Sequence, residues 1–167
     1  MKNVLRSLTL GLMVSTALVS GCTRSIGSTP DANAASATST TARAVAISAD
    51  DTMKFNTTQI YARPGETLAI TLTNKGAVPK AAMAHNLVVL KPGVDVIALA
   101  TSGMTSPQTA YIPAGANDQV LGATKLLGPN ESDTVTLKVP NAPGHYPYFC
   151  SFPGHVMAGM KGELIVE

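Results

Sequence analysis

The sequence has little cysteine, little charge and few aromatic side chains, and each shortage excludes a class of protein. Two cysteines in 167 residues cannot form a disulfide framework, so a disulfide-stabilised miniature scaffold is excluded. Charged residues make up 13% of the chain, about half of the usual share, and the net charge is only +2. After residue 43, eight basic residues stand against nine acidic ones. That part of the chain has no excess of positive charge to attract phosphates, so we expect no nucleic-acid partner.

The first 22 residues have the pattern of an export signal. Lys2 and Arg6 precede a short apolar run at 8–19 that is too short to cross a bilayer as a mature helix. The run ends in Val19-Ser20-Gly21-Cys22, which resembles a bacterial lipobox. The resemblance implies a lipoprotein signal peptide at 1–21, a lipid on Cys22, and an extracytoplasmic protein, in the periplasm or at the cell surface, anchored to a membrane. Ordinary secretion with a free Cys22 thiol is the alternative.

A change in composition separates a tether from a folded domain. Residues 23–41 are rich in Ser, Thr, Ala and Gly and contain almost no large apolar side chain, so they cannot bury a core. We therefore predict a lipidated cysteine and flexible tether at 22–43, spanning roughly 25 Å, followed by one domain at 44–167.

Short segments of the predicted domain alternate apolar and polar residues, as half-buried strands do. Leu68, Ile70 and Leu72 give the clearest alternation, and 134–139 repeats it. Turn residues at 63–66 and 142–144 separate such segments. We expect further strands at 86–90, 119–127, 146–150 and 163–167, a short helix at 95–100 and an irregular flap at 103–117. This pattern predicts an all-β sandwich or barrel with a short helical flap insertion.

Residues 150–160 carry the densest chemistry in the chain. Cys150, His155 and Met160 are each separated by four residues, so one loop can offer a thiolate, an imidazole and a thioether to the same ion. His85 lies far upstream and is the candidate for a second imidazole. Two histidines, one cysteine and a weak axial methionine are the donor set of a blue-copper electron-transfer site.

Each of these residues also has an ordinary explanation. A lone Cys150 is more often a buried core thiol than a ligand, and His85 in isolation is weak evidence. Met157 competes with Met160 for the axial position, but it lies only two residues after His155 and is expected at the surface. We also expect Tyr146 and Tyr148 in the core, His145 facing solvent, Phe152 near Cys150, and Pro147 at a strand edge or bulge.

The segments around these residues resemble the cupredoxin family, and within it the azurins and auracyanins. The resemblance rests on residues 78–86, 123–128, 132–136, 149–155 and 160–164 and extends over about 53–167. It implies a Greek-key sandwich or barrel, and one type 1 copper ion held by His85, Cys150, His155 and Met160. It also implies that the Asn86 side chain joins the two ligand loops.

Three features depart from azurins. Four residues separate His155 from Met160, as in auracyanins and plastocyanins, whereas azurins have three. Ala84 stands where azurins have glycine before the first histidine. In azurins the carbonyl of that glycine approaches the copper, and the substitution leaves open whether the Ala84 carbonyl does the same. The azurin disulfide is missing, and Leu87 replaces a buried Trp. We expect packing to supply the lost stability.

The resemblance implies a protein that carries single electrons by Cu(I)/Cu(II) cycling and is not an enzyme. We expect it to act as a monomer and to dock redox proteins transiently on an apolar patch around His155, formed by residues 153–154 and 156–159. The main alternative is copper storage or delivery on the same scaffold. A copper enzyme would need more than the three histidines present. A Cys150 nucleophile with His155 as base lacks an accompanying oxyanion site, and a zinc site is a minor alternative.

Overall fold

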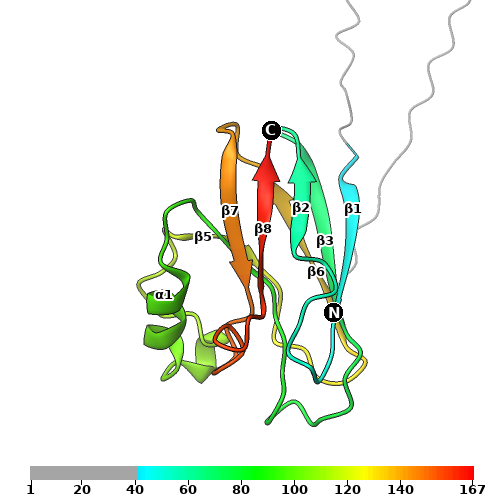
Figure 1. Ribbon diagram of the computed structural model, residues 1–167, viewed down its shortest axis with the longest axis vertical. Coiled ribbons are helices and arrows are strands. Elements are labelled where there is room, and N and C mark those ends of the chain that lie inside the picture. The colour runs from blue at the N-terminus through cyan, green and yellow to red at the C-terminus, as the bar shows by residue number, and fades with distance from the viewer. Residues whose placement is uncertain (1–40) are drawn as a thin grey trace, which may run out of the picture. The chain divides into compact units, whose positions relative to one another are not determined.

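Two facing β-sheets form the domain in the computed structural model, which describes residues 41–167 (Figure 1). The predicted signal peptide, Cys22 and almost all of the tether lie outside the described residues. The three-stranded sheet has the order β1-β3-β6, and the five-stranded sheet has the order β2-β8-β7-β4-β5. The strands are β1 Arg43–Ala49, β2 Gln59–Ala62, β3 Thr67–Asn74, β4 Val88–Leu90, β5 Val120–Ala123, β6 Ser132–Lys138, β7 Gly144–Phe149 and β8 Lys161–Val166. The two facing sheets confirm the predicted all-β sandwich.

Alternation along the strands explains why the two sheets face each other. In β3 every second residue is buried, and Leu68, Ile70 and Leu72 have no exposed surface. These side chains meet those of the other sheet, such as Leu164 of β8, in one core between the layers. Burial of a large aliphatic side chain contributes about 1.5–3 kcal/mol, so this core is the main source of stability.

Strand β7 leads directly into the candidate ligand loop. Tyr146 and Tyr148 point into the core, and Cys150 follows on the same face, as predicted. Their hydroxyl groups donate to backbone carbonyls, Tyr146 to Ala142 at 2.7 Å and Tyr148 to Thr57 at 2.6 Å, so neither is left unpaired in the core. The pairing of β7 with β4 covers Phe149 and Tyr148 and stops before Pro147. Pro147 has no N–H, so it could not have continued the hydrogen bonds between these strands.

The connection from β4 to β5 carries the only α-helix among residues 41–167. Helix α1, Val96–Gly103, begins after Asp95, whose side chain accepts hydrogen bonds from the N–H groups of Ile97 and Ala98. The chain continues through a short 3₁₀ helix, Pro107–Thr109, and irregular backbone, which confirms the predicted helix and flap. In Figure 1, α1 lies beside the loop between β7 and β8.

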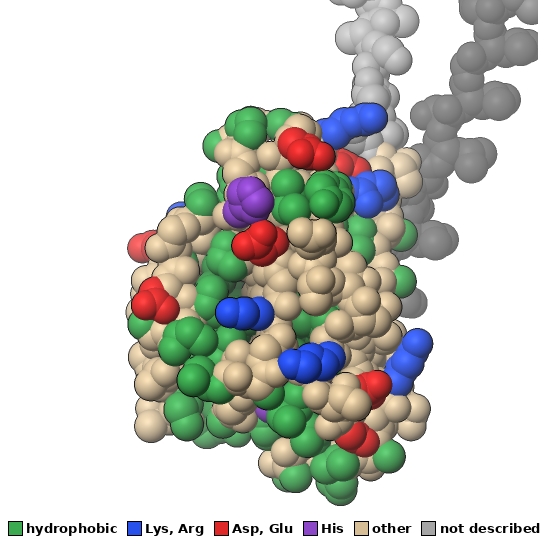
Figure 2. Space-filling model, in the orientation of Figure 1, with side chains coloured by type: hydrophobic (Ala, Val, Ile, Leu, Met, Phe, Trp, Pro, Cys, Tyr) green, Lys and Arg blue, Asp and Glu red, His purple; other side chains and the backbone are tan. Residues whose placement is uncertain are grey.

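Strand β2 is absent from the strands that the sequence predicts. This strand pairs in parallel with β8, about a hundred residues later, and its four residues are too few for a clear alternation. No helix in the described part of the chain is long and apolar enough to cross a membrane. On the face shown in Figure 2, charged side chains of both signs are scattered and form no patch of one sign.

Candidate metal centre

The candidate ligands come from two segments at one end of the sandwich. His85 lies just before β4 and is held by paired backbone hydrogen bonds with Leu127, at 3.1 and 2.8 Å. Cys150 directly follows β7, and Met160 directly precedes β8. The intervening loop folds back on itself, because the Met160 N–H donates to His155 O at 2.9 Å and the Cys150 N–H donates to Met160 O at 3.1 Å. We call residues 150–160 the ligand loop.

A thiol and two imidazoles converge in the interior. One donor atom from each of His85, Cys150 and His155 lies within 4.8 Å of the others. Cys150 Sγ is 3.5 Å from His155 Nδ1, and the centroids of the two imidazole rings are 5.0 Å apart. All three residues are buried, and both ring nitrogens of His85 lack a hydrogen-bond partner among residues 41–167. Because an unpaired buried polar atom is costly, these nitrogens indicate a site that a metal ion would complete.

Burial controls the protonation of the donors when no metal is bound. It raises the pKa of the Cys150 thiol to about 12, partly offset by the backbone N–H groups of Asn86 and Phe152. Burial, with a smaller contribution from the neighbouring His85, lowers the pKa of His155 to about 4. Desolvation likewise lowers the pKa of His85, against the opposing effects of the Asp50 backbone and of the Asp51 and Asp50 carboxylates. At neutral pH both imidazoles are therefore uncharged and can offer a lone pair.

The structure separates the two methionines that competed for the axial role. Met160 is fully buried in the core that also holds Cys150, whereas Met157 is 72% exposed. The carbonyl oxygen of Ala84 lies 3.9 Å from Cys150 Sγ, so it faces the same space. The donor set on offer is thus a thiol, two imidazoles, one thioether and a nearby carbonyl.

The Asn86 side chain joins the two ligand segments, as the resemblance implied. Its amide nitrogen donates to Ser151 Oγ at 2.8 Å, and its carbonyl oxygen accepts from the Ser151 N–H at 2.9 Å. Ser151 Oγ in turn donates to the carbonyl of Ala110 in the flap at 2.6 Å. We had not predicted Ser151, because its role depends on contacts with residues 65 and 41 positions away.

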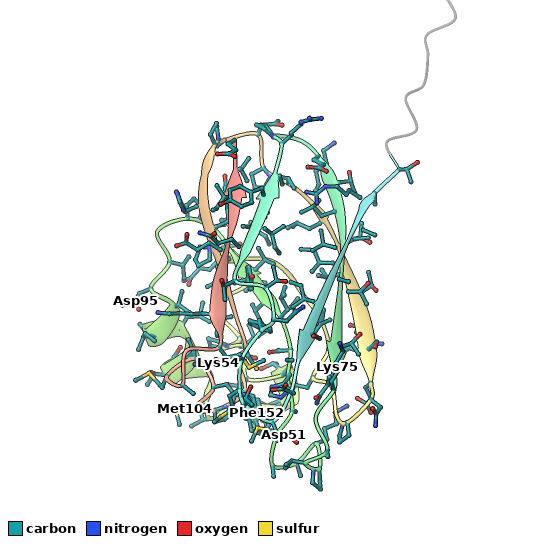
Figure 3. All side chains as sticks on the ribbon, turned by 45° about the vertical axis from the view of Figure 1, so that its right-hand side comes forward. Asp51, Lys54, Lys75, Asp95, Met104 and Phe152 are labelled. Atoms are coloured by element: carbon teal, nitrogen blue, oxygen red, sulfur yellow. The ribbon has the colours of Figure 1, made fainter. Side chains whose placement is uncertain are left out.

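Two further residues hold the ligand loop, Lys54 from outside the loop and Phe152 from within it. The Lys54 ammonium group donates to the carbonyl of Ala158, which ties the loop after β1 to the ligand loop. Figure 3 shows Lys54 and Phe152 at the same end of the domain. The Phe152 ring packs on the ligand loop itself, with its centroid 4.8 Å from that of His155. No short sequence motif indicates that Lys54 makes this contact.

One part of the predicted surface patch is wrong. Val156 is only 4% exposed and packs with Leu99 of α1 and Phe149 of β7, so it belongs to a second core beneath the helix. A side chain in a tight turn can face inward, and its sequence neighbours do not reveal this. His145 is exposed, as predicted, and its Nδ1 lies 2.9 Å from Glu163 Oε2, away from the cluster.

Comparison with known proteins identifies the family. Residues 42–167 match the family model described as copper binding proteins, plastocyanin/azurin family. The chain belongs to this family. It is 37% identical over 125 residues to azurin of Pseudomonas fluorescens biotype B, a match that covers 72% of this chain and 95% of that azurin. It is 40% identical over 124 residues to azurin of Alcaligenes faecalis, covering 72% and 94%.

Solved structures agree with this assignment. The reduced auracyanin of Roseiflexus castenholzii superposes with a TM-score of 0.67 at 29% identity, covering 75% of this chain and 98% of that one. Auracyanin B gives a TM-score of 0.66 at 32% identity, covering 75% and 89%. The predicted cupredoxin resemblance is therefore confirmed, and with it a copper-binding electron-transfer function. A buried thiol and two uncharged imidazoles also suit copper chemically, and one copper ion is consistent with the cluster.

Proposed function

We propose that this cupredoxin carries single electrons by Cu(I)/Cu(II) cycling at a type 1 site that His85, Cys150, His155 and Met160 would hold. One observation carries the proposal: the thiol and the two imidazoles converge within 4.8 Å in the interior. When bound, copper in such a soft donor set would have a reduction potential at which one redox protein can reduce it and another can oxidise it.

Each residue has a distinct role in this proposal. Cys150 loses its proton on binding, since its pKa of about 12 keeps the thiol neutral without a metal. The backbone N–H groups of Asn86 and Phe152 then face the sulfur anion and stabilise it. His85 and His155 bind as neutral imidazoles. Because the Asn86–Ser151 hydrogen bonds hold both segments in place, the ligands need little movement when the charge of the site changes.

The geometry favours an electron carrier over copper storage or delivery, and over an enzyme. Delivery needs ligands that a recipient can reach, yet His85, Cys150 and Met160 have no exposed surface. A catalytic copper site would need additional ligands, and the remaining histidine, His145, is at the surface paired with Glu163. We propose that the protein works as a monomer with no catalytic activity of its own.

Redox partners dock, in this proposal, on the exposed apolar surface beside the ligand loop. Met157 of that loop is 72% exposed, and Met104 after α1 is 52% exposed and lines the same shallow hollow. A small uncharged surface suits brief encounters. Met157→Lys should slow electron exchange with a partner while leaving the copper absorption unchanged. An equal rate would refute this docking surface, and Ile97→Lys, on an exposed part of α1, is the matched control.

A lipid on Cys22 would hold the carrier at a membrane outside the cytoplasm. The proposal is supported by the lipobox-like Val19-Ser20-Gly21-Cys22 and by the composition of residues 23–41. A tether of that length would let the domain turn between partners. Fractionation of cells that express the wild-type chain or Cys22→Ser tests it: the wild type should sediment with membranes and the variant should not.

Absorption and electron-spin spectra of the copper-loaded protein test the central proposal. Cu(II) should give the intense red-region absorption of a thiolate–copper bond. Cys150→Ser should abolish this band, His85→Ala should weaken or shift it, and His145→Ala should leave it unchanged. A colourless copper adduct of the wild-type protein would overturn the proposal.

A further inference from the structure

The flap between α1 and β5 contacts the ligand loop, and this contact gives it a role in the metal centre. We propose that Tyr111, on the flap segment 106–112, is a positioning residue that fixes the His155 ring through Phe152. The inference rests on the proposed copper site, and extends it to a segment that supplies none of the four proposed ligands.

The backbone of the flap segment is held in an unfavourable conformation. Ala110 and Tyr111 have φ angles of +55° and +59°, and two consecutive left-handed residues that both carry a Cβ are uncommon. Such a conformation persists only where the surroundings enforce it. The flap therefore has a defined shape that its contacts maintain.

Three contacts enforce this conformation. The Tyr111 N–H donates to Ser106 O at 2.9 Å, which closes the turn within the flap. Ser151 of the ligand loop donates to Ala110 O at 2.6 Å. The Tyr111 carbonyl packs so closely on Gly103, the last residue of α1, that a Cβ at Gly103 would overlap it. The flap is thus attached both to the helix and to the residue that follows Cys150.

A row of rings leads from the flap to the metal cluster. The Tyr111 and Phe152 rings meet edge to face, with centroids 5.4 Å apart and planes at 74°. Phe152 then packs on His155 at 4.8 Å, and His155 lies 5.0 Å from His85. Edge-to-face contact is the favoured geometry for aromatic pairs, so Tyr111 restricts the positions open to Phe152.

Packing has to orient the His155 ring, because its polar contacts are few. Within residues 41–167 the ring has one polar contact, from Nδ1 to Cys150 Sγ at 3.5 Å. A histidine that binds metal needs a second interaction to hold its ring plane, and such supporting residues commonly tune metal affinity. Here the Phe152 face, backed by Tyr111, supplies that support.

Two substitutions at one position separate the ring from the backbone. Tyr111→Phe keeps the ring and removes only the hydroxyl, which makes no hydrogen bond within the described part of the chain. Tyr111→Asn removes the ring, while asparagine tolerates the left-handed conformation and should leave the flap folded. Tyr111→Gly, which also accepts a positive φ, is the second ring-free variant should Tyr111→Asn fail to fold.

The test measures the Cu(II) absorption spectrum and the rate at which excess EDTA removes copper from the full-length protein. We expect Tyr111→Phe to match the wild type. Tyr111→Asn should lose copper about two- to tenfold faster, the range that corresponds to one aromatic pair, with a shifted red-region band. Urea unfolding of the copper-free variants should show that the fold is retained, so that the change belongs to the bound state.

Three outcomes would overturn the inference. A Tyr111→Asn protein with the wild-type spectrum and release rate would show that the flap does not position His155. A Tyr111→Phe protein as impaired as Tyr111→Asn would assign the effect to the hydroxyl group. A wild-type protein without the red-region band would overturn the proposed function and this inference together, whereas the first two results leave the proposed function intact.

Discussion

Replacing Asn86 by alanine should destabilise the copper-free domain far more than an ordinary loss of one side chain. The change removes two hydrogen bonds to Ser151, at 2.8 and 2.9 Å, each contributing about 1 kcal/mol. It also leaves the buried Ser151 N–H without an acceptor, which costs about 1–3 kcal/mol because water cannot reach it. We therefore expect the free energy of unfolding to fall by about 3 kcal/mol.

Urea unfolding of the copper-free protein measures this loss. Asn56→Ala is the matched control, since Asn56 Oδ1 accepts a 2.7 Å hydrogen bond from the Ser48 N–H at an exposed position, where water can replace it. The control should lose less than about 1 kcal/mol, and both variants should keep the wild-type dependence on urea concentration. An Asn86→Ala protein within about 1 kcal/mol of wild type would refute the view that this side chain joins the two ligand segments.

Four further predictions concern the copper-free protein and can be checked by urea unfolding. Gly162→Ala should destabilise it by at least about 2 kcal/mol, because the new Cβ would overlap the Tyr148 ring. A wild-type free energy of unfolding would show that β7 and β8 can move apart at this position. Ala110→Gly should stabilise it by up to about 1 kcal/mol, since glycine relieves the strain at φ +55°, and a loss would mean that the chain is not left-handed there. Stability should fall by about 2 kcal/mol between pH 7 and pH 4.5. In this range the folded state keeps His155 unprotonated, because its pKa is near 4, whereas the unfolded state binds a proton below about pH 6.5. His155→Gln should therefore reduce the dependence of stability on pH. Above about pH 9 stability should fall again, because the unfolded state loses the thiol proton that the folded state keeps at Cys150.

The parts of the fold that were predictable are those where burial of one face leaves a local pattern. Leu68, Ile70 and Leu72 alternate with threonine and alanine because one side of β3 packs against the core, and that periodicity is visible in the sequence. Strand β2 gives no comparable signal, since four residues gain their partner only when β8 arrives. Pairing over such distances depends on the whole fold.

The candidate site divides in the same way. Cys150 and His155 stand out because their chemistry and spacing are local, whereas Ser151 matters through Asn86 and the flap, which lie far away in the sequence. The inward position of Val156 was missed because the direction of a side chain in a turn is set by α1, packed above it. The cluster of a thiol and imidazoles, and the contact made by Asn86, could thus be predicted from the sequence and the resemblance, but the contacts made by Ser151 and Val156 could not.

The short strand β4 ties the electronic properties of the centre to the register of the whole sheet. All three of its residues pair with β5, Val88 and Val89 also pair with β7, and His85 lies only three positions before it. Successive side chains in extended backbone face opposite ways, so a slip of one position would bring Ala84 or Asn86 to the cluster in place of an imidazole. A one-residue slip in that sheet would take the imidazole away from the thiol, so the red-region absorption of the proposed copper site would report on correct strand pairing during folding.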